Sequence, residues 1–413
     1  MVWIYRILLF ILLFGVSALS HGGNTLSPFL DKLTNVVALI GIPALVLCYL
    51  HYPAFFKVMA WPMLLGVVLL VLESKYLYGT WMYSYFVIKR FFYSGLAMVT
   101  YYVATQARPF KLKYANWLIF SFYLINQIFL GQIFSYSLTS ESRTVTAPES
   151  LYLTIPFLYY MIMYLREHRL SDFFKSILTF ALIVFLLHRS VISAAGAAAF
   201  LLVVFGLFGK ITEQALPLGK TLGTFLVMLC LLAPAVTLLP EAKTQAFLEN
   251  VGGILDPKED ETGSWRLEQS EFYISKIPER LMLGWRYEGY DRGEIMENED
   301  FPEKGTIIHS QYIDMLYNYG AVGLFLNMLL IVGTLVIMYR RNEVFTTEQS
   351  TLFGFLISGL FFSISYQLPV YFWGFVGLAM YYGLFPNESE DFEQPSEPEL
   401  VILTEETINS QPL

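Results

Sequence analysis

The stretch LFLNMLLIVGTLVIMY at residues 324–339 decides the fold class, because it holds no charged residue over a length close to that of a membrane span. With ILLFILLFGVSALS at 7–20 and NVVALIGIPALVLCYL at 35–50, it reaches or approaches the ~20 apolar residues that cross ~30 Å of hydrocarbon. The chain of 413 residues is 56% hydrophobic and 15% charged, with a mean hydropathy of +0.53. That composition is too apolar for a soluble globular protein. We therefore predict an all-α polytopic membrane protein, since the strands of a closed barrel would alternate apolar and polar residues.

About twelve transmembrane helices are expected along the chain. Residues 1–239 are predicted to hold the first nine, near 4–20, 34–50, 57–72, 81–104, 115–134, 151–165, 172–187, 190–208 and 221–239. Residues 311–385 would hold the last three, near 311–338, 351–366 and 368–384, of which the last two could instead form one broken span. Between them, residues 240–310 form a long hydrophilic connection with apolar residues among its charges, which predicts short amphipathic helices. Residues 386–413 carry acids but no Lys or Arg, which predicts a disordered acidic tail.

Basic residues recur in four short connections of the predicted bundle. With a cytoplasmic N-terminus, all four connections fall on the cytoplasmic side, as the positive-inside rule requires. We therefore expect both termini in the cytoplasm and the 240–310 connection on the outer face. The residues concerned are Arg108, Lys111 and Lys113, then Arg166 and Arg169, then Lys210 and Lys220, then Arg340 and Arg341.

Three basic residues stand within or at the edge of predicted spans, where charge is costly. Lys89 and Arg90 fall in the middle of the fourth span and form either a structural pair or an anion-binding subsite. Arg189 follows His188 at the outer membrane surface. It is either an interfacial arginine in a turn between helices or a group that grips a phosphate, for which the planar guanidinium is well suited.

Two further candidates belong to the long connection. Arg266 lies in GSWRLEQ near an expected helix start, where an arginine is ordinarily a solvated surface residue. Of the five histidines, His309 alone stands at the mouth of the connection, beside a long span. A general base acting on a water-borne acceptor would be needed there, although a histidine that only packs at a helix terminus fits the same position.

These residues, taken in order, resemble the O-antigen ligase and O-antigen polymerase family, bacterial membrane enzymes that act on undecaprenyl diphosphate-linked glycans. The resemblance covers residues 180–335, and the first half of the chain only by the layout of its spans. It is carried by Arg189 between two spans, then by Arg266, Pro278 and Gly284, then by His309, Tyr312, Gly320 and Gly323.

The resemblance implies an inverting, metal-independent and cofactor-free glycosyltransferase in the bacterial cytoplasmic membrane, with a glycan or a lipid as acceptor. Arg189 and Arg266 would stabilise the departing diphosphate, with Lys89 and Arg90 as further binding residues, and His309 would position or deprotonate the acceptor hydroxyl. Other polysaccharide-assembly proteins would be its partners, and no nucleic acid is expected. Whether it is a polymerase or a ligase stays open.

Two other classes fit the same composition. A lipid-linked oligosaccharide flippase would line its pathway with Lys89, Arg90 and Arg189, although the internal duplication typical of transporters is not visible in the sequence. A sensor or scaffold would use the acidic stretch 294–303 to bind a partner. The sequence shows no HExxH, GxSxG or Gly-rich phosphate loop, so the usual hydrolase and nucleotide-binding templates are unsupported.

Overall fold

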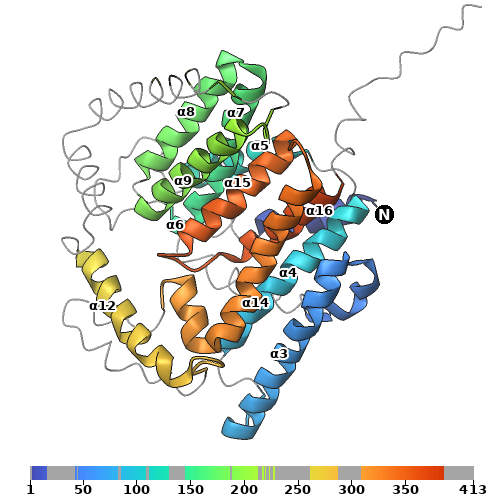
Figure 1. The fold of residues 1–413 in the computed structure, drawn as a ribbon, viewed down its shortest axis with the longest axis vertical. Coiled ribbons are helices and arrows are strands. Elements are labelled where there is room, and N and C mark those ends of the chain that lie inside the picture. The colour runs from blue at the N-terminus through green and yellow to red at the C-terminus, as the bar shows by residue number, and fades with distance from the viewer. Residues whose placement is uncertain are drawn as a thin grey trace, which may run out of the picture.

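The protein is all-helical throughout the residues that the computed structural model describes (Figure 1). These are 2–15, 42–43, 45–81, 85–107, 111–129, 145–186, 188–212, 216–217, 219, 223, 227, 261–286 and 308–385. Three of their helices are long and apolar enough to cross a membrane: α3 (Ala54–Tyr78), α9 (Arg189–Leu207) and α14 (Gln311–Arg341). The stretch Val2–Phe14 and helix α16 (Val370–Leu384) are apolar but shorter. The predicted all-α class is therefore confirmed.

Apart from the helices at 147–150 and 261–276, the remaining helices overlap predicted spans. Residues 347–385 contain two helices, at 347–362 and 370–384. The tail 386–413 and, apart from residues 223 and 227, the span expected at 221–239 lie outside the described residues, as does about half of the span expected at 34–50. The bounds are α1 (Val2–Phe10), α4 (Tyr85–Ala107), α5 (Leu112–Phe129), α6 (Ala147–Ser150), α7 (Thr154–Glu167), α8 (Leu170–Phe185), α12 (Glu261–Lys276) and α15 (Thr347–Phe362), with short 3-10 or π turns at 11–15, 49–51, 151–153 and 277–280.

Helix α16 lies in the centre of the bundle, with α4, α14 and α15 packed around it (Figure 1). Nearly all of its residues are buried, as expected for a helix that is apolar on every side. Its close approach to α4 depends on Gly377, because a Cβ there would lie 2.0 Å from the Ala97 carbonyl oxygen. Small residues allow this kind of backbone contact between helices in membranes.

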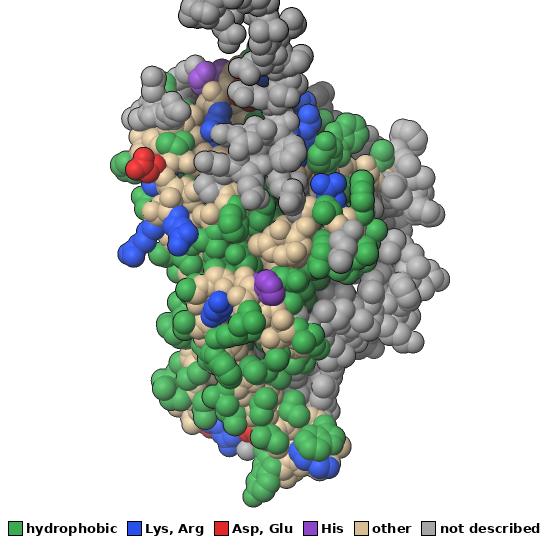
Figure 2. Space-filling model, turned by 90° about the vertical axis from the view of Figure 1, so that its right-hand side faces the viewer, with side chains coloured by type: hydrophobic (Ala, Val, Ile, Leu, Met, Phe, Trp, Pro, Cys, Tyr) green, Lys and Arg blue, Asp and Glu red, His purple; other side chains and the backbone are tan. Residues whose placement is uncertain are grey.

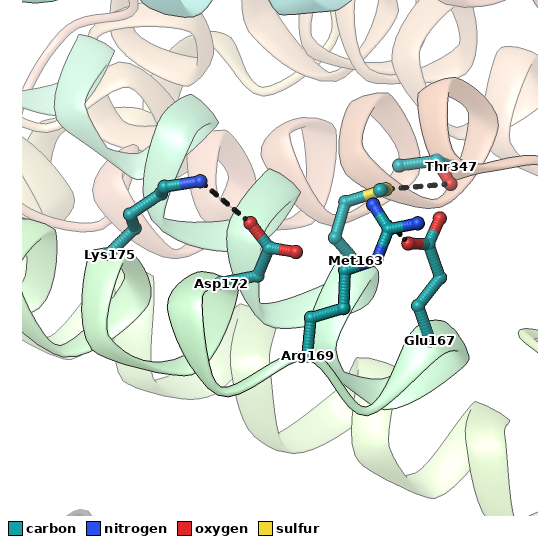
Figure 3. Close-up of polar contacts among 6 residues, drawn as sticks. All are labelled: Met163, Glu167, Arg169, Asp172, Lys175 and Thr347. Carbon is teal, nitrogen blue, oxygen red and sulfur yellow. Dashed lines mark hydrogen bonds and ion pairs between the residues drawn. The ribbon is translucent and has the colours of Figure 1, made fainter.

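One end of the bundle collects three of the four predicted basic connections. Arg166 donates to the Phe345 carbonyl (3.1 Å), and Lys210 donates to the Asn342 carbonyl (2.9 Å), directly after Arg340 and Arg341. Figure 3 shows the α7–α8 turn at this end, where Arg169 pairs with Glu167 (2.8 Å) and Lys175 with Asp172 (3.0 Å). We call this the basic end.

Helix α12 is an amphipathic helix within the long connection, as the sequence predicts. Trp265, Gln269 and Tyr273 are buried at intervals of four residues, and Ile277 continues the same face. A four-residue interval places side chains on one side of an α-helix. Tyr273 and Ile277 form a small separate core with Ile308 and Tyr317, so α12 is held against the first part of α14.

Helix α14 is broken at Gly320, and the segment 281–286 docks into the break. Gly320 has φ 66° and ψ −169°, a conformation that is essentially restricted to glycine. Backbone hydrogen bonds join the two segments on both sides of it, from Trp285 to the Tyr317 carbonyl (2.6 Å) and from Ala321 to the Leu281 carbonyl (2.7 Å). The segment that follows α12 is therefore bound to α14, at the end of α12 opposite to Trp265.

Candidate functional site

His309 lies between two aromatic side chains from different parts of the chain. Its ring centroid is 5.6 Å from that of Trp265 on α12 and 6.3 Å from that of Tyr366, which lies between α15 and α16. Both contacts are edge-on, with interplanar angles of 70° and 68°. The imidazole is partly exposed.

The backbone around His309 is fixed by the turn that follows α15. Gln311 donates its N–H to the Ser363 carbonyl (3.0 Å), and the Ser310 hydroxyl donates to the same oxygen (3.3 Å). On the other side, the Gln367 side chain donates a short hydrogen bond to the Ile308 carbonyl. Four polar contacts of this kind hold His309 at the start of α14, since the Leu368 N–H also donates to the Gln311 side chain (3.2 Å).

Arg266 points at the same tyrosine. Its Nη2 donates to the Tyr366 hydroxyl (3.0 Å), and its Cζ lies 4.7 Å from the centre of that ring. Its Nε is buried and has no hydrogen-bond partner in the part of the chain that the structure describes. Buried donors are nearly always satisfied in native proteins. Arg266 therefore carries an unsatisfied donor in this site, and a guanidinium binds anionic oxygens strongly.

Arg189 begins α9 at the same end of the bundle as His309. The opposite end of α9 contacts the start of α15, where the Phe345 N–H donates to the Lys210 carbonyl (2.8 Å). The two helices are thus antiparallel, and Arg189 lies toward the Phe362 end of α15, just before Tyr366. The preceding His188 has its Nε2 2.6 Å from the Val145 carbonyl oxygen, which anchors the turn.

Lys89 and Arg90 lie near the start of α4 rather than in the middle of the span, because the helix begins at Tyr85 and continues to Ala107. Tyr101 contacts Phe56 (ring centroids 5.6 Å apart), and the adjacent Phe55 lies against Gly333, in the half of α14 that continues to the basic end. The last part of α4 is therefore toward the basic end. Lys89 and Arg90 are accordingly toward the end that holds His309. Their side chains are outside the described part of the structure.

Two residues of this site were not predicted as functional from the sequence. Trp265 directly precedes the candidate Arg266, and this adjacency could have indicated that Trp265 belongs to the site. Tyr366 carried no signal, because a tyrosine between two apolar helices ordinarily reads as packing. We call Trp265, Arg266, His309 and Tyr366 the histidine cluster.

No protein-family model matches the sequence, and no curated protein matches it either. The functional argument therefore depends on the geometry of the histidine cluster and on the chemistry of its residues.

Proposed function

We propose that the protein is a membrane glycosyltransferase that transfers a glycan from an undecaprenyl diphosphate-linked donor to a glycan or lipid acceptor. The observation that supports this most is the histidine cluster, in which one histidine stands between two aromatic rings beside an arginine with an unsatisfied buried donor. Aromatic faces suit sugar rings, and the arginine suits a diphosphate. Polymerase and ligase reactions share these requirements.

The proposal includes a topology. The bundle of about twelve spans would lie in a bacterial cytoplasmic membrane with the basic end and both termini in the cytoplasm, as positive charge favours. Helix α12 and the histidine cluster would then lie on the outer face. A donor whose lipid stays in the membrane would present its diphosphate at this level.

The proposed reaction is an inverting displacement at the anomeric carbon. The acceptor hydroxyl oxygen forms the new bond to that carbon while the bond from the carbon to the diphosphate oxygen breaks. His309 accepts the hydroxyl proton, an effect of about 10²- to 10⁴-fold in rate for general bases. The negative charge that develops on the diphosphate is stabilised by Arg266, with Arg189 as the second cation at this end.

Substitution of Arg266 by lysine tests the proposal directly. Lysine keeps the charge but loses the planar fork of donors, so we expect glycan transfer to fall about 10²-fold, as on loss of one oriented donor. The assay uses full-length protein in detergent with a lipid diphosphate-linked oligosaccharide, and product is resolved by gel or mass spectrometry. Arg169→Lys is the matched control, because this exposed arginine lies at the basic end.

Two results would contradict the proposal, the first its site and the second its activity. Undiminished transfer by Arg266→Lys would remove the histidine cluster from the reaction. Wild-type protein that forms no product with several donors and acceptors, yet moves lipid-linked oligosaccharide across liposome membranes, would establish the flippase instead. Detergent separates the two classes because it leaves no compartments for a carrier to connect.

Tyr366→Phe gives a smaller, separate prediction. The change removes the hydroxyl that accepts from Arg266 but keeps the ring that packs near Arg266 and His309. We expect kcat to fall roughly 10-fold, the size of one hydrogen bond to a charged group, with little change in KM. Tyr339→Phe at the basic end is the control. Equal kcat for wild type and Tyr366→Phe would show that this bond does not orient Arg266.

A further inference from the structure

A cavity of about 670 Å³ lies between α3 and α14, apart from the histidine cluster. Its walls are mostly leucines and other apolar residues of the two helices, among them Leu65, Leu69, Leu72, Val322, Gly323 and Leu326. The three leucines of α3 are each more than half exposed. The charged residues in its lining are Glu73 and Arg286. The volume is within the range of ligand sites, about 300–1,000 Å³.

The cavity and the histidine cluster are at opposite ends of α12. Trp265 contacts His309, whereas the Lys276 carbonyl accepts from the Trp285 indole (2.9 Å), directly before Arg286. Eleven residues of α-helix separate Trp265 from Lys276, which corresponds to roughly 16 Å. The proposed diphosphate site at Arg266 therefore does not include Arg286.

The position of the cavity indicates contact with lipid. Both of its helices are long and apolar enough to cross a membrane, and Figure 2 shows apolar side chains over much of the side of the molecule where α3 lies. The lining runs along α3 from Pro62 to Leu77, roughly 22 Å of helix, whereas one leaflet of the hydrocarbon core is about 15 Å thick. The cavity is therefore long enough to hold one lipid chain.

The end of the cavity near Glu73 has the features of a membrane–water interface. Tyr76 is 88% exposed, and Trp81 is 60% exposed just beyond the end of α3. Lys75 lies 5.4 Å from the Trp81 ring centre. Exposed Tyr and Trp near a helix end are typical of the headgroup level. A lipid chain in the cavity would thus have its headgroup beside Glu73 and Arg286.

Glu73 and Arg286 form an ion pair that is open to further partners. Arg286 Nε is 2.9 Å and 2.7 Å from the two carboxylate oxygens, and Nη1 donates to the Leu283 carbonyl (2.7 Å). Nη2 has no hydrogen bond within the described ranges, and the carboxylate has unused lone pairs. The side chains are 21% and 26% exposed. Arg286 also holds a left-handed backbone conformation (φ 47°), which is costly for a residue other than glycine.

We infer that the α3–α14 cavity binds one acyl chain of a zwitterionic phospholipid with a primary amine, such as phosphatidylethanolamine. The phosphate accepts from Arg286 Nη2, and the ammonium donates to Glu73. The positive Arg286 and the negative Glu73 thus complement the negative phosphate and the positive ammonium of this headgroup. An anionic glycerol headgroup offers Glu73 only neutral hydroxyl donors, which bind a carboxylate less strongly than an ammonium does, and a choline headgroup has no N–H to donate to it. The inference depends on the apolar helices and not on the glycosyltransferase proposal.

The test measures lipid retention by native mass spectrometry on delipidated, full-length protein in detergent. Dioleoyl lipids with ethanolamine, glycerol and choline headgroups are titrated separately. We expect one tightly bound ethanolamine lipid and roughly 10-fold weaker binding of the other two, the size of one charge-assisted hydrogen bond. Glu73→Gln should remove the preference for ethanolamine. Lys175→Gln, which changes an ion pair at the basic end, should keep it.

A second variant tests the cavity without touching the ion pair. Leu69→Trp fills the cavity and should displace the ethanolamine lipid at least roughly 10-fold. Leu178→Trp is the control, since Leu178 on α8 is 64% exposed and is not part of the lining. Equal retention of the three headgroups, tighter binding of a polyprenyl phosphate at this place, or an unchanged result with Leu69→Trp would each overturn the inference.

Discussion

His309→Ala should lower the rate of glycan transfer about 10²- to 10⁴-fold, the contribution expected of a general base. The side chain would take the acceptor proton, and no other imidazole is within the histidine cluster. The measurement is single-turnover transfer in detergent with saturating donor, which reports the chemical step and not product release. The acceptor concentration that gives half of the maximal single-turnover rate should change less than that maximal rate, because the proton moves mainly in the transition state.

Two companion variants separate chemistry from packing. His309→Phe keeps a ring between Trp265 and Tyr366 but has no nitrogen, so it should be as inactive as the alanine variant and retain the fold. His51→Ala removes an exposed histidine that contacts Tyr102, toward the basic end, and should leave transfer unchanged. Transfer by His309→Phe at more than about a tenth of the wild-type rate would contradict the role of general base.

Local patterns made part of this site predictable. Charge inside an apolar chain is costly, so Arg189 could be singled out, and His309 could be singled out as the histidine at the mouth of the long connection. The apolar residues among the charges of the long connection predicted an amphipathic helix, and α12 has that character, with Trp265 and Tyr273 on its buried face. In these cases the signal lies within a few residues, where the helical repeat applies.

The contacts that assemble the site were not predictable in the same way. Tyr366 meets Arg266 across 100 residues of sequence, and no local pattern records such a pairing. The position of Lys89 and Arg90 within α4 depended on a helix boundary, which a smooth run of apolar residues does not define. The ion pair of Glu73 with Arg286 spans 213 residues and was not expected. The resemblance to O-antigen ligases and polymerases remains a prediction.

Gly284 and Gly320 could each be singled out in the sequence, but the contact between them could not be predicted from it. The resemblance includes both glycines, but the sequence does not indicate that they pack against each other. A Cβ on Gly284 would lie 2.6 Å from backbone atoms of Asn318, Tyr319 and Gly320, and a Cβ on Gly320 would lie 2.4 Å from the Met282 carbonyl group. Each glycine therefore leaves room for the backbone of the other segment. This contact fixes both Arg286 and the far end of α12.

Gly320→Ala should accordingly be the most destabilising single substitution among the described glycines with positive φ, at roughly 3 kcal/mol or more. The backbone conformation of Gly320, which is essentially restricted to glycine, costs about 1–3 kcal/mol for alanine, and forcing a methyl group against fixed backbone costs a further ~1–3 kcal/mol. The free energy of unfolding is measured by denaturant titration in detergent, followed by tryptophan fluorescence.

The chain offers a graded pair of controls for this prediction. Gly79 also has positive φ (72°), but a Cβ there would meet no atom within 4 Å, so Gly79→Ala should cost only the backbone part, about 1–2 kcal/mol. Gly196 lies within α9, likewise with open space, and alanine there should be neutral or stabilising by up to ~1 kcal/mol. If Gly320→Ala cost no more than Gly79→Ala, the docking of 281–286 into the break of α14 would not be what stabilises this region. If Gly320→Ala costs more than Gly79→Ala, as we expect, the docking of 281–286 into the break of α14 stabilises this region. The end of α12 at Lys276 and the Arg286–Glu73 pair would then both depend on that docking.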